Sequence, residues 1–110
     1  MSLEPLDPVI HERVRLGILG LLAQAEEVSF GELKQALGVS DGNLASHLRL
    51  LEREGIVAVR KTFVGRRPRT LYRLTPQGRE RFYRYLEALK TLLGSVLEEP
   101  SGTPKKEEPQ

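Results

Sequence analysis

Two short helical segments stand almost back to back in the middle of the chain, and their flanking residues predict where each begins and ends. The segment at 31–37 follows Ser29 and contains Glu32, and these two residues have the spacing of a capping box. It stops at Gly38, because glycine most easily adopts the left-handed backbone that follows a helix. A second segment is predicted over 40–54. Two short helices joined by a tight turn that contains glycine form a helix-turn-helix.

The segment 40–54 is amphipathic. Leu44, Leu48 and Leu51 fall within about 60° of one another at 100° per residue, so they define the buried face. The opposite side suits the major groove of DNA: arginine bonds guanine bidentately, asparagine bonds adenine, and small residues allow close approach. The candidate base-contacting residues are Gly42, Asn43, Ser46, His47, Arg49 and Arg53. Taken alone, this face is equally compatible with an ordinary solvated helix surface.

The next segment, RKTFVGRRPRTLYR at 60–73, has six basic residues and no acidic one. β-prone residues at 56–59 and 70–74 flank a turn around Gly65 and Pro68, so an antiparallel hairpin is predicted. Strand cations can hold phosphates, and an arginine at the tip can enter a narrow minor groove. The candidate residues are Arg60, Lys61, Arg66, Arg67, Arg69 and Arg73. The alternative is a loop kept soluble by charge, although such loops usually mix signs.

The formal charge is strongly polarised along the chain. Residues 1–59 hold five basic and nine acidic residues, for −4, whereas residues 60–97 hold ten and two, for +8. Residues 98–110 hold two and four, for −2, which gives the total of +2. A concentrated positive region favours a polyanion, and the hairpin pattern favours nucleic acid over a membrane surface.

Two further helices are predicted at 8–23 and 76–97, each opened by a polar residue and a proline. The later helix has apolar residues at heptad spacing, and the earlier one is apolar on two sides. Because one small domain would struggle to cover so long a stripe, we expect a symmetric homodimer. The expected interface residues are Val9, Leu16, Phe82, Tyr85, Leu86, Leu89, Leu92, Leu93 and Val96. The alternative is that the last helix folds back over its own domain.

The sequence lacks the residues that several classes of function require. The chain has no cysteine, and its two histidines have no nearby metal-ligand spacing, so neither a metal nor another cofactor is expected. The sequence contains no phosphate-binding glycine loop, nucleophile elbow or plausible acid–base pair, so the chain is not expected to be an enzyme. Without a membrane-length apolar run or a secretory signal, a cytoplasmic location is expected. One domain is predicted over 1–97, followed by a disordered proline-rich, charged tail at 98–110.

Three stretches resemble the small winged-helix transcriptional regulators related to the MarR and ArsR groups. They are LDPVIHERVRLGIL, VSFGELKQALGVSDGNLASHLRLLEREGIV and KTFVGRRPRTLYRLTPQGRERF, and the resemblance covers about residues 6–97. It implies a homodimeric DNA-binding protein whose third helix enters the major groove and whose basic hairpin, the wing, contacts the backbone or minor groove. Position by position, the resemblance adds Asp41 to the recognition residues. The chain lacks the cysteines and histidine clusters of the metal-sensing members, so the resemblance does not imply a metal effector for this chain.

The expected fold is therefore a mainly α winged helix-turn-helix with a β-hairpin wing, a three-helix core and a long C-terminal dimerisation helix. The expected function is sequence-specific binding of double-stranded DNA to regulate transcription, most simply by repression. Two alternatives stay open: a winged-helix module that docks a protein partner, and a sequence-tolerant architectural or RNA-binding protein. The sequence identifies no operator, regulated gene or small-molecule effector.

Overall fold

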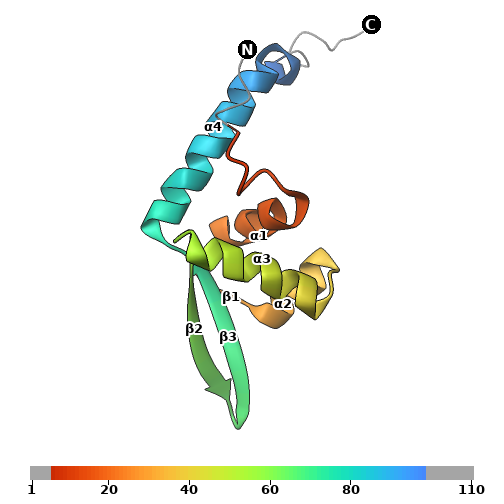
Figure 1. The fold of residues 1–110 in the computed structure, drawn as a ribbon, viewed down its shortest axis with the longest axis vertical. Helices are drawn as coiled ribbons and strands as arrows, with labels where there is room; N and C mark the ends of the chain where they lie inside the picture. The colour runs from red at the N-terminus through yellow and green to blue at the C-terminus, as the bar shows by residue number, and fades with distance from the viewer. Residues whose placement is uncertain (1–5, 99–110) are drawn as a thin grey trace, which may run out of the picture.

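A computed structural model describes residues 6–98 (Figure 1). Four helices and three strands follow one another in the order expected for a winged helix-turn-helix. They are α1 (Arg13–Ala23), β1 (Val28–Ser29), α2 (Phe30–Leu37), α3 (Asp41–Arg53), β2 (Val57–Val64), β3 (Arg67–Leu74) and α4 (Pro76–Glu98). The tail predicted for 98–110 lies, apart from its first residue, outside the described residues.

The three strands form one antiparallel sheet in the order β1-β3-β2. β2 and β3 pair along their whole length, from Val57 opposite Leu74 to Val64 opposite Arg67. β1 pairs only with residues 71 and 72 of β3, so the sheet is three-stranded at its base and two-stranded beyond it. The two-stranded part projects away from the helices (Figure 1). We call the whole β2–β3 hairpin the wing.

The core lies between α1, α2, α3, the base of the wing and the first half of α4. Leu44, Leu48 and Leu51 are buried, so the apolar face predicted for α3 is confirmed. They pack with α1 residues such as Ile18 and Leu22 in a single hydrophobic cluster. Burial of each such side chain stabilises the fold by about 1.5–3 kcal/mol.

Both helices of the helix-turn-helix begin as their flanking residues predict. The Ser29 hydroxyl accepts from the Glu32 amide, and the Glu32 carboxylate accepts from the Ser29 amide, which completes the capping box. Gly38 ends α2 with a φ of 64°. The Ser40 hydroxyl then caps α3 by accepting from the Asn43 amide at 3.1 Å.

The prediction for the first helix is wrong at its start. α1 begins at Arg13 and not at residue 8, because Glu12 has an extended backbone and its carboxylate caps the helix. Asp7 instead organises a separate turn, in which its carbonyl accepts from the His11 amide at 2.7 Å. The Asp7-Pro8 signal therefore marks a turn that precedes the helix. The strands also extend further toward the tip than the predicted 56–59 and 70–74.

A tight junction joins the end of α3 to the start of α4. The Thr75 hydroxyl donates to the Gly55 carbonyl at 2.6 Å and accepts from the Gly78 amide at 2.8 Å. A Cβ on Gly78 would lie 2.0 Å from the Ile56 carbonyl oxygen, so only glycine fits there. This junction fixes the direction of α4 relative to α3.

Candidate nucleic-acid interface

The outer face of α3 is exposed and polar. Its exposed residues are Asp41, Gly42, Asn43, Ser46, Arg49, Glu52 and Arg53, and all of them except Glu52 were predicted to contact DNA. Lys34 of α2 makes an ion pair with Asp41 at 2.9 Å, which links the two helices at the surface. Such an exposed pair contributes little to stability, about 0–1 kcal/mol, so Asp41 remains available to a partner.

His47 lies apart from the other predicted contact residues. Its side chain is only 18% exposed, because it packs at the contact between α3 and α1. The Arg15 guanidinium donates to His47 Nδ1 at 2.9 Å, and the Glu12 carboxylate lies 3.8 Å from the same nitrogen. Since a guanidinium can only donate, Nδ1 accepts and Nε2 carries the proton. His47 therefore joins two helices through Nδ1, and its contact with DNA stays a prediction that involves Nε2–H.

The wing exposes every one of its predicted cationic residues. By strand alternation and register, Arg60, Arg67, Arg69 and Arg73 share one face of the hairpin, and Lys61 lies on the other. Arg66 lies in the two-residue loop with Gly65, whose φ of 63° suits a tight hairpin turn. The hairpin thus presents cations on both faces and at its tip.

Arg60 has a partner within the protein that the sequence did not predict. Its guanidinium donates to both carboxylate oxygens of Glu27, at 2.8 and 3.0 Å. The hydrogen bond from Arg60 lowers the pKa of Glu27, and the positive charges of Arg73 and Arg69 lower it further. Glu27 reaches this face because β1 pairs with β3; residues 28–30 are β-prone in sequence, but their local pattern does not predict this pairing. In this structure, Arg60 is therefore already neutralised.

α3 packs against the base of the wing. Tyr72 of β3 lies close enough to α3 that the charges of Glu52 and Arg49 influence its pKa, which burial raises. Val57 and Leu74, at the start of β2 and the end of β3, belong to the same hydrophobic cluster as Leu48 and Leu51. α3 and the base of the wing therefore share one hydrophobic core.

The apolar residues of α4 divide into two groups. Phe82 and Tyr85 are 4% and 1% exposed, so they belong to the core of the protomer. Their assignment to an interface between protomers is corrected accordingly, because almost no surface of either remains for a partner. Leu86, Leu93 and Val96 are exposed further along α4. The remaining predicted interface residues, Val9, Leu16, Leu89 and Leu92, are partly buried.

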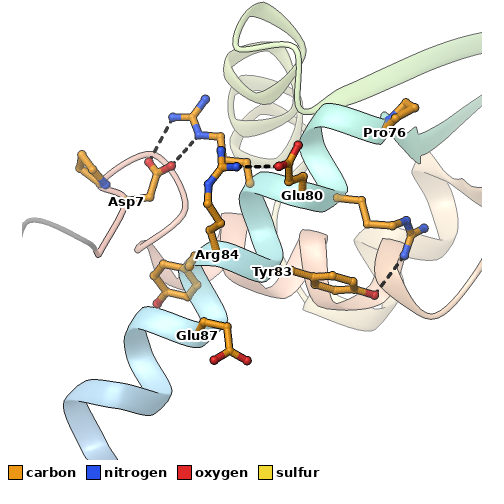
Figure 2. Close-up of a pocket in the computed structure, with 10 residues that line it drawn as sticks. Asp7, Pro76, Glu80, Tyr83, Arg84 and Glu87 are labelled. Atoms are coloured by element: carbon orange, nitrogen blue, oxygen red, sulfur yellow. Dashed lines mark hydrogen bonds and ion pairs between the residues drawn. The ribbon is translucent and has the colours of Figure 1, made fainter.

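A groove of about 1000 Å³ runs between residues 7–8 and the first half of α4 (Figure 2). Its arginines have partners: Arg81 pairs with Asp7 at 2.5 Å, and Arg84 pairs with Glu80 at 3.0 Å. Arg81 also pairs with Glu54 at the end of α3, so the segment before α1 is tied to both α3 and α4. This groove lies on α4, away from the α3 face and the wing, and its charges are largely balanced.

Within residues 6–98, side chains do not gather into a group of three or more that could hold a metal ion. None of the helices in the same range is both long and apolar enough to cross a membrane. Within the described residues, the α3 face and the wing thus carry the largest group of exposed polar and basic side chains.

Comparisons with known proteins cover most of the chain. The family model for a winged helix DNA-binding domain matches residues 14–93. An uncharacterized protein of Methanocaldococcus jannaschii is 37% identical over 88 residues, which cover 80% of this chain and 96% of the relative.

Two solved structures share the fold over most of their length. A transcriptional regulator homologue from Pyrococcus horikoshii matches with a TM-score of 0.78 and 34% identity, covering 84% of this chain and 93% of that one. A regulator of the MarR family from Enterococcus faecalis matches with a TM-score of 0.70 and 27% identity, covering 86% and 84%. The resemblance inferred from the sequence motifs is thereby confirmed.

Proposed function

Because the chain belongs to the winged helix DNA-binding family of transcriptional regulators, we propose that it is a sequence-specific repressor that binds its operator as a homodimer. α3 would enter the major groove, and the wing would contact the backbone and the adjacent minor groove. The family is one of regulators and not of enzymes.

The observation that carries the proposal is the contrast between the two sides of α3. Its inner side is fixed by three buried leucines, whereas its remaining surface presents seven exposed polar or small residues to solvent. Arg49 can bond guanine bidentately and Asn43 can bond adenine, while Gly42 and Ser46 leave room for the groove. The packing of α3 against the base of the wing supports simultaneous binding of bases and phosphates.

The C-terminal half of α4 supports a homodimer. Its exposed leucines and valine keep the heptad spacing of residues already buried in the protomer, with a kink at Gly94 (φ 2°, ψ −90°) between Leu93 and Val96. A two-fold interface through Leu86, Leu93 and Val96 would cover this stripe, and the partly buried Val9, Leu16, Leu89 and Leu92 could extend it. Such a dimer would place two α3 helices about 34 Å apart, which is one turn of DNA.

Selection of duplexes from a random pool, followed by sedimentation of the protein with the selected DNA, tests the proposal. We expect a pseudo-palindromic site with half-sites about 10 base pairs apart, bound by two protomers with at least ~10³-fold preference over a scrambled duplex. Steep salt dependence without preference would instead indicate a sequence-tolerant binder. Negligible DNA binding would indicate a protein-docking module.

A further inference from the structure

The outer half of the wing exposes apolar side chains as well as cations. Beyond the level where β1 pairs with β3, two strands continue alone to the loop (Figure 1). In this part Phe63 is 67% exposed and Val64 is 58% exposed. Pro68 lies directly opposite Phe63 and is also exposed. The tip of the wing is therefore partly apolar, and its role is not explained by folding.

The surroundings of Phe63 indicate what covers it. Lys61, Arg66, Arg67 and Arg69 all lie within the same outer half of the hairpin, where no residue is acidic. Repulsion between these cations disfavours pairing of two wings, and the cations attract a polyanion. A partner that offers both negative charge and apolar surface is required, and a DNA groove offers phosphates at its rims and sugars and bases inside.

The widths of the two grooves of B-DNA indicate which groove Phe63 enters and how. The minor groove of B-DNA is about 6 Å wide, which admits single side chains but not a two-stranded ribbon. Phe63 lies two residues before Gly65, at the end of a strand with a fixed register, so its ring is held at the tip. α3 is the element proposed for the major groove, and a minor groove lies beside it.

We propose that Phe63 is an apolar wedge that enters the minor groove at the flank of the operator. This proposal rests on the DNA-binding function proposed above. The ring presses against the sugars and the edge of one base step, while Lys61, on the same face of the hairpin as Phe63, and Arg66 in the loop hold the neighbouring phosphates. Pyrimidine–purine steps such as TA are the easiest to unstack, so the wedge favours them. Phe63 thus contributes specificity at a position where no base is hydrogen-bonded.

The test uses the full chain and a set of operator duplexes in which one TA step is moved through the flanks. We expect the wild type to bind duplexes with the step under the wing about 10-fold more tightly than duplexes with an A-tract there. Phe63→Ala should lose this preference and bind the TA duplex about 10-fold more weakly, with an unchanged salt slope. Phe63→Leu keeps apolar bulk and should retain most of the preference. A 2-aminopurine beside the step should brighten with the wild type, as the base unstacks, and not with Phe63→Ala.

Tyr83→Ala is the matched control, because it removes a half-exposed aromatic residue from α4 instead of the wing. All three variants should unfold at the wild-type midpoint. If Phe63→Ala binds both duplexes like the wild type, or weakens both equally with a flatter salt slope, the wedge is refuted. If the wild type itself does not prefer the operator over a scrambled duplex, the proposed function fails and the wedge fails with it.

Discussion

The junction between α3 and α4 and the outer half of the wing are opposite kinds of structure. At the junction, Thr75, Gly78 and the carbonyls of Gly55 and Ile56 satisfy one another in a space that admits no further atom. In the outer wing, side chains extend into solvent and only the strand ladder holds the backbone. Folding dictates the residues of the first region, whereas a partner molecule best explains those of the second. Substitutions should therefore affect stability in the first and DNA binding in the second.

The largest expected effect is on stability, from Gly78→Ala. The added Cβ would lie 2.0 Å from the Ile56 carbonyl oxygen, so α4 or the start of β2 must shift. We expect a loss of at least about 3 kcal/mol in the free energy of unfolding, measured by urea denaturation. Gly42→Ala is the control, because a Cβ there meets open space, and it should be neutral or stabilising by up to ~1 kcal/mol. Equal stability of both variants would show that the junction is not tight.

Arg49→Ala should change recognition without changing stability. Arg49 is exposed on the outer face of α3, so its loss leaves the core intact. We expect discrimination at one base pair of each half-site to fall by ~1–3 kcal/mol, measured by competition between single-base operator variants. A uniform loss on all sequences would place Arg49 on phosphate and not on a base.

Asp7→Asn should alter the pH dependence of stability. The hydrogen bonds from Arg81 lower the pKa of Asp7 in the folded state below its ordinary value of 3.8. The stabilisation from this carboxylate is therefore complete above about pH 4 and is lost as the pH falls through the lower folded pKa. We expect the variant to lose ~1–2 kcal/mol at pH 7 and to show a shallower decline in stability as the pH falls below about 4. Arg81→Gln should remove the same pH-dependent contribution to the free energy of unfolding. If stability at acidic pH declines as steeply in both variants as in the wild type, the Asp7–Arg81 pair is not its cause.

Glu27→Gln should strengthen DNA binding slightly. The substitution removes the charge that Arg60 faces, so the guanidinium becomes available to phosphate. We expect a few-fold higher affinity, with a salt slope steeper by about 0.9 for each additional phosphate that the protein neutralises. Glu26→Gln changes the net charge equally but leaves the Arg60–Glu27 pair intact. If the two variants raise the affinity equally, the change in net charge alone explains the effect, and the release of Arg60 does not.

Features specified by neighbouring residues were predicted well from the sequence. The capping box of α2, Gly38 and the leucine face of α3 depend on interactions within one or two turns, so their spacing identifies them. The start of α1 was misplaced because Asp7-Pro8 is compatible with both a turn and a helix start. The distinction depends on the extended backbone at Glu12, which the pattern does not reveal.

Features that join distant parts of the chain were missed. The Arg60–Glu27 and Arg15–His47 pairs link residues 33 and 32 positions apart, and both depend on how the elements pack. Likewise, the heptad pattern of α4 identifies its apolar side but not the surface that covers it. Phe82 and Tyr85 pack on their own protomer, whereas Leu93 and Val96 do not. Sequence spacing alone cannot separate these two outcomes.

The most direct test of the division between α3 and the wing is the salt dependence of Arg67→Ala. Fluorescence anisotropy would compare this variant with the wild type on the operator and on a scrambled duplex, from about 50 to 200 mM salt. If the wing arginines bind phosphates, the variant weakens both duplexes alike, and its salt slope is shallower by about 0.9 for each phosphate that is no longer neutralised. A changed preference between the two duplexes with an unchanged slope would contradict this division.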